Sequence, residues 1–295
     1  MSKTTYTRRA DGLYRYQLYI GVDANGKKKY KSLYAHTIPE LEKKMRAARS
    51  LMDAGQRLEA ADQPFRMWAQ RLMDLKEPDL AATYYRGLVG RCRWWMERIG
   101  DVPVAKVLTS DLQDGITALS KAGRSKKTLT DYRNTAAAVL DLALHDRAIS
   151  ANPAQWVTIP KAAPRSQRFA LTAEERSWID TTAHRAQTAA MVMMHAGLRR
   201  GELLALTWGD VDWQAGMVAV NKSVAFDGNT PVLKRGGKTD AATRSVPLDP
   251  VLRDYLRPLS GARSPLELIV PGSDGKPMTE SAFTRMWDSY LAVLN

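Results

Sequence analysis

The side chains best suited to chemistry lie in residues 195–212, which read HAGLRRGELLALTWGDVD. Gly197 can end a helix and let the backbone turn, so that Arg199 is presented at a junction. Glu202 follows three residues later, close enough to orient the guanidinium by a charge-assisted hydrogen bond. A guanidinium fixed in this way suits a phosphate, because its planar fork matches two oxygens. From these residues alone, a structural salt bridge between Arg199 and Glu202 remains the alternative.

The elements around this stretch predict a mixed α/β region over residues 169–295. Thr172 and Glu175 form a capping box ahead of a first helix, and two further helices are expected over 189–194 and after Leu198. The remaining predicted elements are strands near 217–225, 232–234 and 244–248, and helices over 250–256 and 279–294.

The stretch around Arg199 closely resembles the first arginine motif of the tyrosine recombinases, or phage integrases. The usual form of that motif is Gly-Leu-Arg, then Glu-Leu and Leu-x-Trp-x-Asp. A second match is Gly237-Lys238-Thr239, followed by TRSVPL at residues 243–248, which resembles the family's β-hairpin. The resemblance implies that Arg199 and Lys238 are catalytic and that Glu202 supports them. Lys238 would act as general acid toward the leaving 5′ oxygen.

The resemblance also implies a mechanism that needs no metal and no nucleotide cofactor. A tyrosine attacks a DNA phosphodiester and forms a 3′-phosphotyrosine link, while arginines and a histidine stabilise the phosphoryl charge. The family's second motif, His-x-x-Arg followed by the tyrosine, cannot be present, because no histidine follows His195. Tyr255 and Tyr290 lie downstream of Arg199, but both fit helical packing positions. We therefore expect a catalytic domain that lacks its C-terminal part and is inactive alone.

Positive charge is concentrated at the N-terminus, where residues 1–50 hold 12 Lys and Arg against 4 Asp and Glu, a net +8 of the chain's +13. A period-two alternation of side chains predicts strands on either side of a turn at 23–26. A helix is expected from 38 to 54. By resemblance, residues 1–58 form an arm-site-binding domain, a three-stranded sheet plus helix that can enter a DNA groove. A solvated edge strand is the alternative. The candidate DNA contacts are Arg8, Arg9, Arg15, Lys27, Lys28, Lys29 and Lys31.

The middle of the chain is helical, with helices expected over 64–76, 79–99, after 109, and 127–145. By resemblance, residues 62–152 form an all-α core-binding bundle, and the proline-containing stretch 153–168 is a linker. Residues 123–128 (GRSKKT) open the last helix, whose N-terminus could bind a phosphate or could simply be a capped, solvated helix start. The candidate DNA contacts here are Arg124, Lys126, Lys127, Thr128 and Arg133. The fold class is therefore multidomain α+β.

Composition excludes several other classes of protein. A net charge of +13 and a pI near 9.8 favour a polyanionic partner. The apolar run at 189–198 is shorter than the roughly 20 residues that a membrane span needs. Cys92 is the only cysteine, so neither an internal disulfide nor a cysteine zinc cluster can form, and the four histidines lack metal-ligand spacing. We expect no cofactor, no metal, no membrane association, and a place in the cytoplasm of a bacterial host.

Together these features predict a phage-type integrase that binds double-stranded DNA at arm-type and core-type attachment sites for site-specific recombination. The resemblance implies a multimer on DNA, with an excisionase or a host DNA-bending protein as further partners. The alternative function is a non-catalytic DNA-binding regulator derived from an integrase. A basic transcription factor with chance similarity is a weaker third option, because the motifs of Arg199 and Lys238 both match the tyrosine recombinases.

Overall fold

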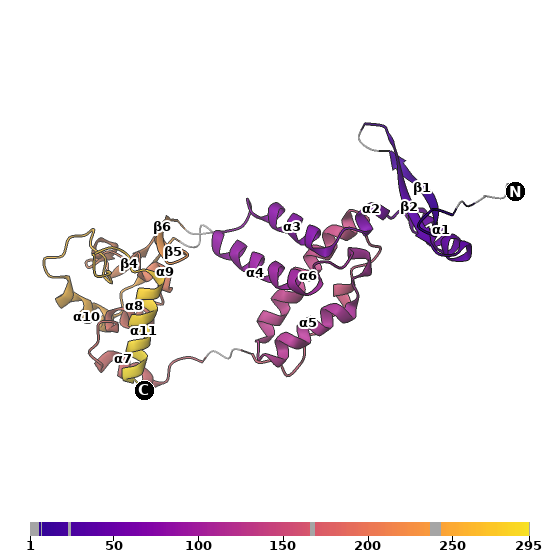
Figure 1. Cartoon of the computed structure of the whole chain (residues 1–295). Coiled ribbons are helices and arrows are strands. Elements are labelled where there is room, and N and C mark those ends of the chain that lie inside the picture. Colours follow the sequence, from indigo (N-terminus) through magenta and orange to yellow (C-terminus); the bar gives the residue numbers. More distant parts are fainter. Residues whose placement is uncertain (1–5, 7, 23–24, 166–168, 237–242, 295) are drawn as a thin grey trace. The chain divides into compact units, whose positions relative to one another are not determined.

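The computed structural model describes residues 6, 8–22, 25–165, 169–236 and 243–294. The chain divides into two compact units, Met1–Gln167 and Arg168–Asn295. Figure 1 shows the course of the chain through both units. Each unit has a hydrophobic core of its own, so each is described by itself.

The first unit begins with an antiparallel pair of strands, β1 (Tyr14–Val22) and β2 (Lys28–Ala35), followed by helix α1 (Ile38–Asp53). Thr37 caps α1 by accepting a hydrogen bond from the backbone N–H of Glu40. The third strand that we expected is not found among the described residues, where Arg8 forms only an isolated bridge with Tyr14. Residues 1–5 and 7 lie outside the described residues.

A four-residue helix, α2 (Leu58–Ala61), joins this sheet to the rest of the first unit. Leu58 packs in the small core under the sheet with Leu18 and Ala48. Ala60, two residues on, belongs to the larger core of the helical bundle. The two cores therefore meet across a single turn of helix.

The bundle packs its helices around an aromatic and aliphatic core in which Phe65, Trp68 and Trp95 are almost fully buried. Its elements lie close to the predicted ranges, because apolar residues recur at helical spacing along each of them. They are α3 (Phe65–Lys76), α4 (Ala82–Ile99), η1 (Val104–Lys106), α5 (Thr109–Lys121), α6 (Lys126–His145) and η2 (Pro153–Trp156).

The first part of the stretch expected to be a linker packs on the bundle instead. Ala154, Val157 and Ala163 are buried in the bundle's core, and the Thr109 hydroxyl donates to the carbonyl of Pro153. The proline content of the stretch predicted a linker, but it does not reveal that these small apolar side chains are buried.

The second unit combines six helical elements with five strands over its described residues. Strands β3, β4 and β7 form one antiparallel sheet, and β5 pairs with β6 in a separate hairpin. The elements are α7 (Ala173–Thr181), α8 (Gln187–His195), α9 (Arg200–Leu203), η3 (Trp208–Asp210), β3 (Val211–Asp212), β4 (Met217–Val220), β5 (Lys222–Asp227), β6 (Thr230–Arg235), β7 (Arg244–Pro247), α10 (Pro250–Ser260) and α11 (Glu280–Leu294).

The fold is α+β, as predicted from the sequence. The capping box of α7 is present, since Thr172 and Glu175 exchange side-chain-to-backbone hydrogen bonds. None of the helices in the described ranges combines the length and apolar character required to cross a membrane.

Candidate functional site

Arg199 occupies the junction between α8 and α9, as the N-cap residue of α9. Gly197 makes the preceding turn in the left-handed region, with φ of 62°. Leu198 and Leu203 are buried on either side, whereas the Arg199 side chain is 78% exposed. The backbone is therefore anchored while the guanidinium faces solvent.

Helix α9 lies directly against strand β5. A Cβ atom on Gly201 would lie 2.6 Å from the carbonyl oxygen of Val224. Because only glycine leaves room for this approach, the close packing fixes the turn that carries Arg199 against the β5–β6 hairpin.

The carboxylate of Glu202 holds Arg199 in two ways. Its Oε2 accepts a hydrogen bond from the Arg199 backbone N–H at 2.8 Å, and its Oε1 accepts one from Nη1 at 2.9 Å. The contact predicted from the three-residue spacing is present. Since the Glu202 side chain is only 9% exposed, it is a fixed anchor for the exposed guanidinium.

A second arginine, Arg244, contacts the same carboxylate and was not predicted from the sequence. Its Nη1 and Nη2 donate to Oε1 and Oε2 of Glu202 at 3.0 and 2.9 Å. Arg244 opens strand β7 and pairs with Val220 of β4. The only signal for it was its place in the 243–248 motif, which does not reveal a partner 42 residues away.

These contacts favour the ionised form of Glu202. The hydrogen bonds from Arg244, together with those from the backbone and side chain of Arg199, lower the pKa of Glu202 to about 2, against the opposing effect of its burial. The carboxylate in turn raises the pKa of Arg244. The three side chains therefore carry a net charge of about +1 at neutral pH.

Lys238 lies outside the described residues, within the segment 237–242 that connects β6 to β7. Described residues flank this connection on both sides: the Gly236 N–H donates to the carbonyl of Asn221, and Arg244, two residues after the segment, contacts the Glu202 carboxylate. The β7 end of the connection is thus anchored at the site that holds Arg199.

Two further ion pairs support the region. Arg200 Nη2 lies 3.0 Å from Glu280 Oε1, linking α9 to the start of α11. Lys222 Nζ lies 2.8 Å from Asp210 Oδ2 and is largely buried, so it tightens the fold beside the site.

Comparison with known proteins identifies the domain that contains this site. Residues 166–293 match the family model of the phage integrases. This part of the chain, residues 166–293, is a domain of the phage integrase family. Arg199, Glu202 and Arg244 all lie in the part matched by the family model.

A curated relative from Caldanaerobacter subterraneus subsp. tengcongensis is described as tyrosine recombinase XerC-like. It is 23% identical over 233 residues, which is 75% of this chain and 59% of the relative. The chain therefore spans less than two thirds of that relative's length.

Two solved integrases share the fold. The Tn1549 transposon integrase in complex with a circular intermediate DNA matches with a TM-score of 0.68 at 17% identity, over 79% of each chain. A lambda integrase tetramer bound to a Holliday junction matches with a TM-score of 0.62 at 15% identity, over 97% of this chain and 82% of that chain.

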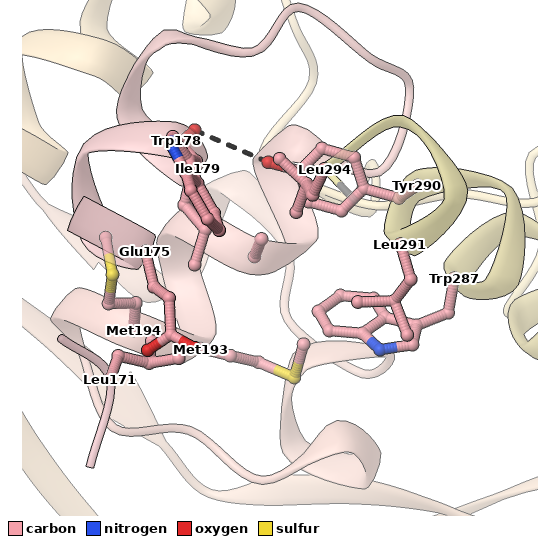
Figure 2. Close-up of a pocket in the computed structure, with 11 residues that line it drawn as sticks. Leu171, Glu175, Trp178, Ile179, Met193, Met194, Trp287, Tyr290, Leu291 and Leu294 are labelled. Carbon is pink, nitrogen blue, oxygen red and sulfur yellow. Dashed lines mark hydrogen bonds between the residues drawn. The ribbon is translucent and has the colours of Figure 1, made fainter.

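The two tyrosines that follow Arg199 in this chain are packing residues. Tyr290 is 1% exposed, stacks on His184, and donates a hydrogen bond to the carbonyl of Ile179 at 3.4 Å. Burial raises the pKa of its hydroxyl. Figure 2 shows Tyr290 at the wall of an apolar groove of about 280 Å³ between α7, α8 and α11. The Tyr255 hydroxyl hydrogen-bonds to Thr188.

The N-terminal sheet of the chain has one face against α1 and one in solvent. Tyr16, Leu18 and Leu33 face α1. The opposite surface, which we call the open face, follows from the strand register, because directly paired residues share a face. It consists of Arg15, Gln17, Tyr19, Tyr30, Ser32 and Tyr34.

The predicted DNA-contacting residues of this sheet divide between the two faces. Lys29 pairs with Glu59 at 3.1 Å, and Lys31 pairs with Asp62 and also donates to the carbonyl of Leu58, so both lie on the α1–α2 side. Arg15 is on the open face, and strand alternation places Lys28 there as well.

The other basic residues near the sheet have partners of their own. Arg8 donates to the carbonyl of Gly12, and Arg9 pairs with Asp11 while its guanidinium lies over the ring of Tyr34. Lys27 also has an interaction partner. These contacts leave Arg9 beside the open face.

The N-terminus of α6 is already partly occupied. The Lys126 N–H donates to the carbonyl of Pro164, and the Thr128 N–H donates to Ser125 Oγ. The Lys127 ammonium pairs with Asp131, and Arg133 donates to Asn134. Because two of the first-turn amides are taken, the structure favours a capped helix start over a backbone phosphate site. Arg124 is exposed beside it.

Over the described residues, no group of three or more His, Cys, Asp or Glu side chains is arranged to hold a metal ion. His195 instead lies between two aspartates, with Nε2 3.4 Å from Asp180 Oδ1 and Nδ1 3.2 Å from Asp249 Oδ1. It therefore links α8 to α7 and to the start of α10.

Proposed function

We propose that this chain is the DNA-binding portion of a phage-type integrase, and that these 295 residues bind duplex DNA without cleaving it. One observation carries the proposal. Within an integrase-family domain, the exposed guanidinium of Arg199 is fixed by a buried, ionised Glu202 that also holds Arg244.

The geometry suits a phosphodiester. Arg199 uses one guanidinium N–H for Glu202, and an arginine has five such donors, so the remaining donors can bind phosphate oxygens. We propose that Lys238 joins it as the general acid, since Lys238 lies six residues before Arg244 in the sequence. A positive group fixed before the reaction stabilises developing charge without reorganisation.

Cleavage needs a nucleophile and further phosphate ligands that these residues do not supply. No histidine follows Arg199, and Tyr290 is buried with its hydroxyl bonded to Ile179. Because catalytic groups act together, loss of several leaves almost no activity.

The two remaining parts of the chain are proposed to recognise DNA at separate sites. The sheet would bind arm-type sites through Arg9, Arg15 and Lys28. The helical bundle would bind core-type sites through Arg124, Lys126, Lys127, Thr128 and Arg133. Solved relatives are described as a transposon integrase with circular intermediate DNA and as a lambda integrase tetramer on a Holliday junction, which supports assembly as a multimer. An excisionase or DNA-bending protein would be a further partner, in a bacterial cytoplasm.

Footprinting on the DNA that flanks the gene, combined with a nicked suicide substrate, tests the proposal. We expect protected sites and no covalent protein–DNA adduct. Deletion of residues 1–55 should abolish arm-site protection and retain weaker core-site protection. A trapped adduct, or equal loss at both sites, would contradict the proposal.

The alternative is a non-catalytic regulator that occupies attachment sites. The burial of Tyr290 and the side-chain hydrogen bond of Tyr255 support this alternative as strongly as they support the proposed function. The coding DNA downstream of Asn295 separates the two functions, because a His-x-x-Arg motif followed by a tyrosine there would favour the integrase.

A further inference from the structure

The open face of the N-terminal sheet presents a regular array of side chains. The register pairs Arg15 with Tyr34, Gln17 with Ser32, and Tyr19 with Tyr30. We propose that Arg15 and Gln17 read base identity in the DNA major groove, with the tyrosines at the rim. This inference rests on the proposed DNA-binding function and assigns sequence recognition to two particular residues.

The dimensions of a two-stranded ribbon fit this groove. The major groove of B-DNA is about 12 Å wide and admits a β-ribbon of two strands. Side chains at positions i and i+2 of a strand are roughly 6.8 Å apart, and stacked base pairs are about 3.4 Å apart. A strand that follows the groove therefore places Arg15 and Gln17 over base pairs two steps apart.

Arg15 is held in a geometry that leaves donors free for a base. Its Nε and Nη2 donate to Ser32 Oγ at 3.3 and 3.1 Å, which orients the guanidinium across the strands. The Nη1 group and the second hydrogen of Nη2 remain. Two parallel donors of this kind match O6 and N7 of guanine.

Gln17 stands at the centre of the array and is exposed. No hydrogen bond of its side chain is found within the described part of the chain. Its amide carries a donor and an acceptor side by side, which matches N6 and N7 of adenine. An unpaired amide at this position is available to a base and is not needed for folding.

The surroundings of the pair suit the groove rim. Tyr19 and Tyr30 are 47% and 50% exposed and lie edge to face with ring centroids 5.7 Å apart. Their hydroxyls can donate to backbone phosphates. Lys29 and Lys31 are bound to acids on the other face, so Arg9 and Lys28 supply the charge beside the open face.

Selection of binding sequences from a randomised duplex library tests the assignment, using the full chain and its variants. The wild-type chain should enrich a motif with a guanine and an adenine two base-pair steps apart. Gln17→Ala should relax the adenine alone, and Arg15→Ala the guanine alone. Each should lose roughly 5- to 150-fold discrimination, the range for one bidentate base contact.

Two controls separate base reading from other effects. Lys28→Gln should lower the salt dependence of binding by about one phosphate contact and leave the motif unchanged. Gln70→Ala, an exposed change on α3, should leave both unchanged. Far-UV circular dichroism of each variant should match the wild type, because both proposed reading residues are exposed.

The outcomes distinguish this inference from the proposed function. Failure of the wild-type chain to enrich any duplex would refute DNA recognition altogether. Enrichment that is unchanged in Gln17→Ala and Arg15→Ala would refute only the assignment of these residues. A change in oligomeric state without a change in motif would show that the open face binds protein.

Discussion

Glu202 and Arg244, 42 residues apart in the chain, form a bidentate ion pair with N···O distances of 3.0 and 2.9 Å. The same carboxylate accepts two hydrogen bonds from Arg199. One buried acid therefore joins the α8–α9 junction to strand β7. Its removal should affect both the stability of the second unit and the position of the exposed guanidinium.

Replacing Glu202 by glutamine should lower the free energy of unfolding of the second unit by roughly 1–3 kcal/mol. The neutral amide leaves two arginines without their counter-charge, although both retain some contact with solvent. Urea unfolding followed by tryptophan fluorescence measures the change. Glu280→Gln provides a matched control, because the exposed Arg200–Glu280 pair should contribute at most about 1 kcal/mol. Equal effects of the two changes would contradict the anchoring role of Glu202.

Stability should also depend on pH through Glu202. Because its pKa is lowered to about 2 from its ordinary value of 4.5, its contribution is complete above the unfolded pKa and is lost as pH falls toward 2. The loss should approach about 3 kcal/mol at most. Between pH 6, 4 and 2.5, the difference in urea midpoint between the wild type and Glu202→Gln should therefore shrink and be smallest at pH 2.5. A gap that stays constant with pH would show that ionisation of Glu202 is not responsible.

Gly201→Ala should destabilise the second unit by roughly 1–3 kcal/mol. The new Cβ would lie 2.6 Å from the backbone oxygen of Val224, so α9 must move away from β5. Gly90→Ala in α4 meets no atom within 4 Å and should stabilise its helix by up to about 1 kcal/mol. Thermal unfolding of both variants measures the contrast, and a neutral Gly201→Ala would mean that the close approach is not required.

Leu58→Ala should loosen the N-terminal sheet from the bundle. Leu58 is 5% exposed in the core under the sheet, and a cavity there costs roughly 2–4 kcal/mol. Hydrogen exchange of β1 and β2 amides should accelerate while amides of α3 and α6 keep their rates. Leu75→Ala, at a site that is 54% exposed, should change neither set. Equal acceleration throughout the first unit would indicate that sheet and bundle unfold together.

Local signals in the sequence predicted most elements of the fold. Each of these signals depends only on residues close together in the sequence. Examples are the alternation in residues 14–22, the capping box at Thr172 and the glycine at 197. The contact between Arg199 and Glu202 was predictable for the same reason. The two-residue strand β3 was missed, because it carries too few residues to show a period.

What the sequence could not provide was the choice of distant partners. Arg244 was visible within a motif, but its carboxylate lies on another element. Strand alternation places Lys29 and Lys31 on one face, yet only the position of α2 shows that this face is turned toward Glu59 and Asp62. Burial of Ala163 likewise depends on the shape of the bundle.

The proposed contact between Arg199 and a DNA phosphate can be measured through the salt dependence of binding to duplex DNA. The wild-type affinity should fall steeply with salt on logarithmic axes, and the Arg199→Ala variant should show a slope shallower by about 0.9, the value for one phosphate contact. Its free energy of unfolding should fall by at most about 1 kcal/mol, because the side chain is 78% exposed and Arg244 still pairs with Glu202. A flat wild-type response, or the same slope for both proteins, would show that Arg199 does not bind a phosphate.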